Sequence, residues 1–221
     1  MTHPGRLGLI GGTFDPIHWG HLDAARAAAG VLGLTDLLFM PSHVPPHRPL
    51  QTLASSFHRC AMTALAIQDV PDARVSDIEL SRPGPSYSTE TLAHLHLEGW
   101  RPAQIFFVIG TDAFAEIATW RGYPALLDLC HFAVISRAGA EPEAVTCGHD
   151  QIRSRLSTPA LLTSQPARTC VVPVPASTRP ISSSEVRARV AGGLAVTDLV
   201  PPPVAAYIAR QGLYRPGQQF A

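Results

Sequence analysis

The chain has 221 residues, of which 46% are hydrophobic, and its 17 basic and 17 acidic residues leave no formal net charge when the ten histidines are neutral. A chain of this size can bury a substantial core. The charge balance excludes the general basic surface of nucleic-acid-binding proteins and a polybasic membrane tail. Every basic residue is arginine, which excludes lysine bases and Schiff bases and leaves arginine or protonated histidine as the only cationic clamps.

Neither a targeting segment nor a membrane span is expected. The first apolar run, residues 7–10, is too short for either, and no later window holds about 18 apolar residues without a break. The four cysteines, Cys60, Cys130, Cys147 and Cys170, form no CxxC pair. This favours unpaired thiols in a reducing compartment over a disulfide frame or a zinc site, so we expect a cytoplasmic protein.

Strand-like and helix-like segments alternate along the chain. Apolar or alternating runs that predict strands occur at residues 7–10, 37–40, 74–80, 105–109, 132–135 and 169–172. Helical periodicity occurs at residues 21–32, 55–67 and 88–97, the last with Ser88 and Thr89 as its predicted cap. The alternation predicts an α/β protein with a doubly wound, Rossmann-like parallel sheet.

Several finer expectations follow from the same pattern. The helix at 55–67 should bury one face, made of Phe57, Cys60, Ala61, Ala64, Leu65 and Ala66. Proline clusters at 41–49, 173–180 and 201–203 predict rigid loops, and the weakly patterned residues 139–157 predict a surface excursion. We expect one domain over residues 1–180, with a helical C-terminal segment, 181–221, packed on it.

Ligands of such sheets bind beyond the carboxyl ends of the strands, and the first strand is followed there by the string GGTFDPIHWGH, residues 11–21. The glycines let the backbone turn sharply and let a ligand approach. His18 and His21 flank Gly20 and share one face at a helix start. Free N–H groups and the helix dipole favour a polyphosphate there, and imidazole donors can stabilise charge on a phosphate oxygen. The alternatives are a plain turn with capping or packing histidines, or a metal pair, for which no third ligand stands nearby.

A second string, ISSSEVRAR at residues 181–189, follows Pro180. Its serines supply an N-cap and more open N–H groups, and Arg187 lies about one turn into the predicted helix, within reach of an anion at its start. Taken alone, this string is explained better by an ordinary capped helix with surface arginines.

The first string resembles the signature of the nucleotidyltransferase superfamily with the (H/T)xGH motif, and is most similar to bacterial nicotinate-nucleotide adenylyltransferases. The second resembles that family's ISSTxIR motif, with Ser184 for Thr and Val186 for Ile. The resemblance implies the nucleotidyltransferase fold and catalytic roles for His18, His21 and Arg187. It implies ATP binding by Gly11, Gly12, Thr13, Phe14, His18, Gly20, His21, Gly110, Asp112, Ile181, Ser183, Ser184 and Arg187.

Shorter strings extend the resemblance over almost the whole chain. PPHR at 45–48 resembles PPHK, SYSTETL at 86–92 resembles SYTxDTL, GTD at 110–112 followed by tryptophan resembles GxD…W, and the tail at 199–214 resembles LVPxxVxxYI…LY. From the residues alone, Trp120 suits the core and a ring-stacking site equally. The resemblance implies substrate binding by His47, Arg48, Ser88, Trp120, Tyr123 and Arg137.

The reaction implied by the resemblance is adenylyl transfer from ATP to nicotinate mononucleotide, giving nicotinate adenine dinucleotide and pyrophosphate in NAD biosynthesis. Mg²⁺ should arrive with ATP rather than at a dedicated protein site. The expected partners are therefore ATP and nicotinate mononucleotide, without nucleic acid or membrane, and a homo-oligomer stays open. The alternatives are nicotinamide mononucleotide or phosphopantetheine as substrate, or a non-catalytic nucleotide sensor. A class I tRNA synthetase fragment also has an HxGH-like corner, but its lysine-bearing second motif cannot exist here.

Overall fold

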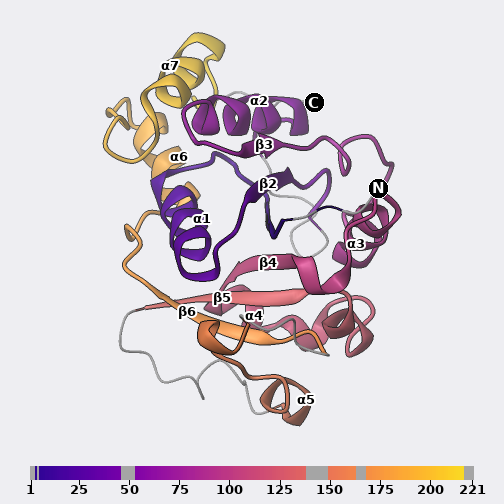
Figure 1. The fold of residues 1–221 in the computed structure, drawn as a ribbon. Coiled ribbons are helices and arrows are strands. Elements are labelled where there is room, and N and C mark those ends of the chain that lie inside the picture. Colours follow the sequence, from indigo (N-terminus) through magenta and orange to yellow (C-terminus); the bar gives the residue numbers. More distant parts are fainter. Residues whose placement is uncertain (1–2, 4, 46–52, 138–148, 163–167, 217–221) are drawn as a thin grey trace. The chain divides into compact units, whose positions relative to one another are not determined.

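The structure is a computed structural model that describes residues 3, 5–45, 53–137, 149–162 and 168–216. Its strands form a six-stranded sheet in the order β3-β2-β1-β4-β5-β6 (Figure 1). The strands are β1 (Leu7–Gly12), β2 (Asp36–Pro41), β3 (Ala73–Val75), β4 (Ile105–Gly110), β5 (His131–Arg137) and β6 (Val171–Ala176). This order, in which the sheet grows outward from β1 in both directions, is that of the doubly wound class, as the sequence predicts.

Helices separate the strands along the chain. They are α1 (Trp19–Leu32), α2 (Ser56–Ile67), α3 (Ser88–Leu97), α4 (Thr111–Ala115), α5 (Asp150–Arg153), α6 (Ser183–Ala191) and α7 (Pro202–Gln211), with short 3-10 turns at Pro102–Gln104, Ile117–Thr119, Ala125–Asp128 and Pro159–Leu162. Among the helices of the described ranges, none is long and apolar enough to cross a bilayer.

The chain forms two compact units, each built from separate stretches. Unit 1 comprises Met1–Ile10, Ala24–Leu37 and Tyr87–Ser177, and unit 2 comprises Gly11–Asp23, Leu38–Ser86 and Thr178–Ala221. The two glycine- and serine-rich strings of the sequence therefore both belong to unit 2. The strand ends at Gly110 and Arg137 belong to unit 1.

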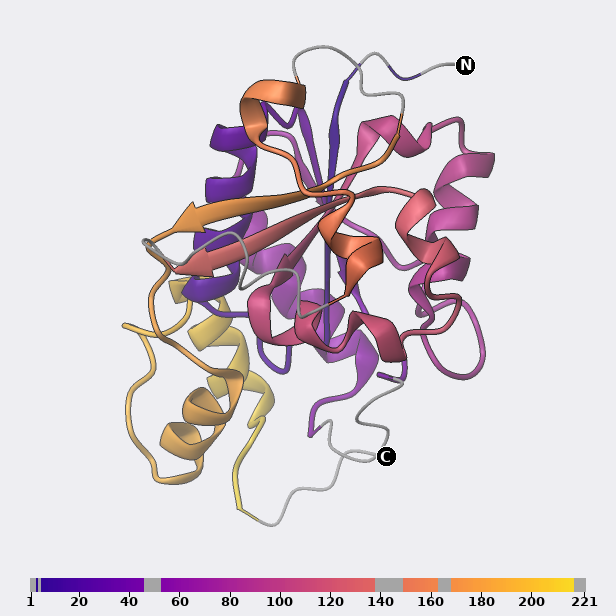
Figure 2. The same ribbon diagram turned by 90° about the horizontal axis from the view of Figure 1, so that it is seen from below.

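Unit 1 is organised by parallel strands with long apolar runs, such as Ile105–Ile109 in β4 and Phe132–Ile135 in β5. β1 pairs with β4 from Leu7 opposite Ile105, and β4 pairs with β5 with Phe107 opposite Phe132. Such continuous runs suit strands that are buried on both faces. β5 and β6 lie side by side (Figure 2).

Two proline clusters are only partly the loops that the sequence predicts, since Pro180 lies in a loop but other members do not. Pro173 and Pro175 lie within β6, which tolerates them because it is the last strand of the sheet and an edge strand leaves half of its N–H groups unpaired. Pro202 begins α7, where a missing N–H costs nothing. Thr169 precedes β6 instead of opening it, and its hydroxyl donates to the Leu127 carbonyl at 2.6 Å.

Three further expectations are corrected. β3 covers three residues, because the chain turns after it, with Ser81 N–H donating to the Asp77 carbonyl. α3 begins at Ser88, but its N-cap is Tyr87 and no side chain caps it. The surface excursion predicted at 139–157 is wrong at Ile152 of α5, which is fully buried, and its residues 139–148 lie outside the described residues.

The predicted buried face of α2 is wrong except at Ala66, which is buried. Phe57 is 75% exposed, whereas Arg59, at 1% exposure, is among the largest buried side chains. Ser55 does cap the helix by accepting from the His58 N–H. A buried arginine inverts the apolar pattern, because periodicity assigns a charged residue to the solvent side. Of the cysteines, Cys60, Cys130 and Cys170 are free thiols, and Cys147 lies outside the described residues.

Candidate active site

The segment between β1 and α1 folds back sharply on itself. Phe14 has a positive φ of 51° and turns its ring under Gly12, where an added Cβ would lie 2.8 Å from the ring. The ring is buried and meets the edge of His21 at 5.0 Å. Glycine is therefore required at position 12 for Phe14 to reach the core.

His18 and His21 stack on each other, with ring centroids 3.7 Å apart and 28° between the planes. The His18 N–H donates to His21 Nδ1 at 3.2 Å, which places the His21 proton on Nε2. Nδ1 of His18 is buried and has no hydrogen-bond partner among the described residues. A Cβ at Gly20 would lie 3.0 Å from the Arg179 carbonyl and 3.1 Å from that same Nδ1, so glycine allows this close approach.

Burial controls the charge of both imidazoles. It lowers the pKa of His18 to about 4, against the opposing attraction of Asp23. It lowers the pKa of His21 well below its ordinary value, and the neighbouring His18 acts in the same direction. Both rings are neutral at pH 7, so each offers a single N–H donor instead of a cation.

The ISSSEVRAR string is joined to this corner by direct hydrogen bonds. α6 begins at Ser183 with Ser182 as its N-cap, and the Ser183 hydroxyl donates to the Pro16 carbonyl at 2.9 Å. Arg187 donates to the Asp15 carbonyl at 2.7 Å and to Ser184 Oγ at 3.1 Å. The structure therefore brings the two predicted phosphate motifs together, and we call residues 11–21 with 181–187 the phosphate corner.

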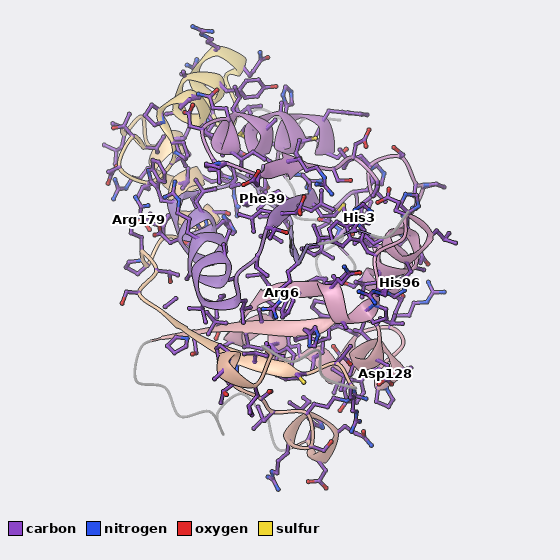
Figure 3. The ribbon with its side chains drawn as sticks, in the orientation of Figure 1. His3, Arg6, Phe39, His96, Asp128 and Arg179 are labelled. Carbon is purple, nitrogen blue, oxygen red and sulfur yellow. The ribbon has the colours of Figure 1, made fainter. Side chains whose placement is uncertain are left out.

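A bidentate ion pair fixes the approach to α6. Arg179 (Figure 3) donates from Nε and Nη2 to the two oxygens of Asp23, at 2.8 and 2.7 Å. Its guanidinium lies 4.5 Å from the centre of the Trp19 ring. Ile181 is half-buried and comes two residues later, and its N–H donates to the Arg179 carbonyl.

Sequence reasoning missed a buried charge network beneath the corner. Asp15, only 3% exposed, accepts from the N–H groups of Leu53 and Ala54 and, at 2.8 Å, from the Tyr214 hydroxyl. Arg59 donates to three carbonyls, those of Thr13, His43 and Ala54. Burial lowers the pKa of Arg59, and Asp15 opposes that shift.

The remaining described candidates lie in unit 1. β4 ends at Gly110, where an added Cβ would meet nothing within 4 Å, and Asp112 is exposed in the first turn of α4. Between them, Thr111 donates to the Ile135 carbonyl at 2.9 Å and ties the ends of β4 and β5 together. Trp120 is half-buried and meets Phe107 edge-on at 5.9 Å, so it lies at the margin of the core.

The turn at 120–123 packs on the start of α3. A Cβ at Gly122, which has φ +88°, would lie 2.7 Å from the Thr89 side chain. Arg121 pairs with Glu90 at 2.9 Å and lies 4.5 Å from the centre of the Tyr87 ring. This packing brings two predicted substrate segments together: Ser88 on α3, and Trp120 and Tyr123 in the turn. We call residues 120–123 with 87–90 the ring shelf.

The side chains of three predicted substrate residues lie outside the described part of the structure. His47 and Arg48 lie outside the described residues, and Arg137 ends β5 with its backbone paired to Ala176. Within the described ranges, no three metal-ligating side chains gather in one place.

The fold and the joined motifs define a class. The family model for cytidylyltransferase-like proteins matches residues 9–189, so the chain belongs to the cytidylyltransferase-like nucleotidyltransferases. It is 43% identical over 219 residues to a probable nicotinate-nucleotide adenylyltransferase of Cronobacter sakazakii, covering 96% of this chain and 97% of the relative. A relative of the same name from Moorella thermoacetica is 38% identical, covering 98% and 94%. The chain is therefore a member of the nicotinate-nucleotide adenylyltransferase family of enzymes.

Solved structures agree on the fold. The Plasmodium falciparum nicotinic acid mononucleotide adenylyltransferase complexed with NaAD matches with a TM-score of 0.66 at 19% identity, covering 95% of this chain and 97% of that one. The same enzyme complexed with APC gives 0.64. A putative nicotinate-nucleotide adenylyltransferase from Vibrio parahaemolyticus gives 0.60 at 18% identity, covering 97% and 98%. The predicted fold and family are thus both confirmed.

Proposed function

We propose that this chain transfers the adenylyl group of ATP to nicotinate mononucleotide, releasing pyrophosphate and forming nicotinate adenine dinucleotide for NAD biosynthesis. The observation that carries the proposal is the joining of the imidazole-bearing segment to α6: Arg187 donates to the Asp15 carbonyl and Ser183 to the Pro16 carbonyl. Membership of the family supports the choice of substrates.

The reaction needs no protein nucleophile. A 5′-phosphate oxygen of the mononucleotide attacks the α-phosphorus of ATP in line, the new P–O bond forms, and the bond to the β-phosphate oxygen breaks with its electrons leaving on pyrophosphate. A phosphomonoester has its second pKa near about 6 and is largely ionised at neutral pH, so no strong base is required. Catalysis of such a transfer consists of positioning and charge stabilisation.

The phosphate corner supplies these two functions. In the proposal, the neutral rings of His18 and His21 donate to the α-phosphate as charge shifts onto it. Arg187 donates one hydrogen bond to the Asp15 carbonyl and one to Ser184 Oγ. In the proposal its other N–H groups donate to the β- and γ-phosphates, with Ser183 and Ser184 beside it. Gly11, Gly12 and Gly20 leave room for the nucleotide, with Thr13, Phe14 and Ile181 lining it.

The ring shelf would take the pyridine ring of the mononucleotide. In the proposal, the half-buried Trp120 stacks on the ring with Tyr123 close to it in sequence, and the start of α3 at Ser88, which no side chain caps, offers N–H groups to the ring carboxylate. Gly110 and Asp112 would face the ATP ribose, and His47, Arg48 and Arg137 the phosphate of the mononucleotide. Mg²⁺ would come with ATP, because it binds mainly phosphate oxygens and water. We place the reaction in the cytoplasm.

A direct assay tests the proposal. Pure protein is mixed with ATP, Mg²⁺ and nicotinate mononucleotide, and pyrophosphate release is followed; nicotinamide mononucleotide and phosphopantetheine serve as competing substrates. Release with the acid substrate is expected. Binding of ATP without release would indicate the sensor instead, and preferential adenylylation of phosphopantetheine would overturn the substrate assignment.

The role of the imidazoles has its own test. We expect His21→Ala to lower kcat by about 100-fold, as loss of one preorganised donor does, with the KM for ATP changed by less than about 3-fold. His94→Ala is the matched control, since that ring pairs with Glu98 on half-exposed α3, and should leave both constants unchanged. Equal losses of binding and turnover in His21→Ala would exclude a role confined to the transition state.

A further inference from the structure

Asp15 and Arg187 are close neighbours that do not form a tight ion pair. The nearest approach of the guanidinium to the carboxylate is 4.0 Å, with the Asp15 side chain buried and the Arg187 side chain half-buried. Arg187 donates instead to the backbone carbonyl of the same residue at 2.7 Å. A guanidinium beside a carboxylate normally forms shorter, often bidentate hydrogen bonds. The 4.0 Å separation of Arg187 and Asp15 therefore requires a physical explanation.

The cause is that other donors already occupy the carboxylate. Leu53 N–H donates to Oδ2 at 2.9 Å, Ala54 N–H to Oδ1 at 3.2 Å, and the Tyr214 hydroxyl to Oδ1 at 2.8 Å. Tyr214 is the one side chain among these donors, and it comes from a position 199 residues away in sequence. Because the Tyr214 hydroxyl already donates to Oδ1, the carboxylate has less remaining capacity to accept a hydrogen bond from the Arg187 guanidinium.

The Tyr214 hydroxyl is a permanent donor. Burial raises the pKa of Tyr214 well above its ordinary value, and the negative charge of Asp15 acts in the same direction. The phenol therefore keeps its proton over the whole working pH range. Arg59 and Arg187 together also place two positive charges near the single negative charge of Asp15, which leaves an excess that suits a polyphosphate.

We propose that Tyr214 is a positioning residue for anion binding: by satisfying Asp15, it keeps the Arg187 guanidinium available to the pyrophosphate part of ATP. The identity of this anion rests on the proposed function. Without the hydroxyl, Oδ1 loses a donor inside the protein. The Arg187 guanidinium, whose Nη1 lies 4.0 Å from the other carboxylate oxygen, Oδ2, would then be drawn onto Asp15 and away from the anion.

The experiment compares Tyr214→Phe with Tyr207→Phe. Tyr207 is a matched control because its hydroxyl also makes a partly buried hydrogen bond in unit 2. Its partner is His58 Nδ1, at 2.9 Å, and not Asp15. In Tyr214→Phe we expect the Kd for inorganic pyrophosphate and the KM for ATP to rise by about 5- to 10-fold, which corresponds to the net contribution of one ordinary hydrogen bond. The KM for nicotinate mononucleotide should stay unchanged. In Tyr207→Phe, the Kd for pyrophosphate and the KM for ATP should both be unchanged.

A double-mutant cycle separates positioning from general destabilisation. If Tyr214 acts through Arg187, then Tyr214→Phe should have no further effect on pyrophosphate affinity once Arg187→Ala is present. The same loss in both backgrounds, or a lowered Tm with unchanged pyrophosphate affinity, would overturn the proposal. These binding measurements stand even if the wild-type enzyme prefers another adenylyl acceptor, which the activity assay decides separately.

A second measurement does not depend on the folding of any variant. A crystal structure of the wild-type protein with pyrophosphate should show Arg187 on the anion while the Tyr214 hydroxyl stays on Asp15. Arg187 paired with Asp15, and the anion bound elsewhere, would overturn the proposal.

Discussion

The phosphate corner of unit 2 and the ring shelf of unit 1 hold their charged groups in opposite ways. The side chains of Arg187 and Asp15 are 24% and 4% exposed, whereas those of Arg121 and Glu90 are 60% and 45% exposed. Asp15 of the corner lies in a buried hydrogen-bond network that Arg187 joins, and the charged groups of the shelf make surface contacts. Charge that develops in a transition state needs dipoles fixed in advance, while a flat ring needs only a matching surface. The difference therefore follows the chemistry proposed for each region.

The largest effect should come from breaking the support under the corner. We expect Arg59→Met to lower the free energy of unfolding by about 3–5 kcal/mol, because it leaves three carbonyls and the Asp15 charge without their buried cation. Arg121→Met, the same substitution in the ring shelf, should cost less than about 1 kcal/mol. Urea unfolding of both variants measures the contrast, and equal losses would show that the corner is no more tightly built than the shelf.

Acid should distinguish the corner from a buried histidine elsewhere. Burial lowers the pKa of His18 in the corner and of His131 in unit 1 to about 4 each. His131 is an internal residue: its ring stacks on Phe106, and its Nδ1 accepts from the Cys170 N–H. Imidazole NMR should show both rings neutral down to about pH 5. Bound pyrophosphate should then raise the pKa of His18, because an anion favours the protonated ring, and leave that of His131 unchanged.

The same shifts have a consequence for stability. An unfolded histidine binds its proton near about pH 6.5, and the folded ring only near pH 4. The unfolded state therefore holds more protons between these values, so stability is full above the unfolded pKa and falls as the pH drops toward 4. Each of the two rings contributes about 3 kcal/mol to this loss. A free energy of unfolding that is constant from pH 7 to 5 would contradict the neutral assignment.

Local patterns in the sequence predict the corner's motifs but not the network beneath them. β1, β4 and the two strings follow from short apolar runs and fixed spacings, which need no distant partner. Asp15 gives no sign of being buried, because the donor that singles it out, Tyr214, is 199 residues away. Arg59 is buried on the side of α2 that the apolar periodicity assigns to solvent. Buried charge is invisible to a polar–apolar pattern, and it is the feature on which the corner depends.

The ring shelf can be tested through substrate binding alone. We expect Trp120→Ala to raise the KM for nicotinate mononucleotide by about 10-fold, the typical worth of one aromatic stacking contact. The KM for ATP should not change. Trp120→Phe keeps a flat ring and should recover most of the loss. Steady-state kinetics with each substrate varied in turn gives all of these values, and a parallel rise in the KM for ATP would show that Trp120 serves the core instead of the shelf.

The smallest effect should come from the exposed ion pair of the shelf. Glu90→Gln removes one charge from the pair with Arg121, but Arg121 still lies over the Tyr87 ring. Exposed pairs contribute at most about 1 kcal/mol and are screened by salt. We therefore expect a change of less than about 2-fold in the KM for nicotinate mononucleotide, absent at about 0.5 M salt, with Glu98→Gln at the other end of α3 as the control. A rise above about 5-fold that persists in high salt would mean that the shelf, like the corner, depends on a fixed charge, and the contrast between the two regions would no longer hold.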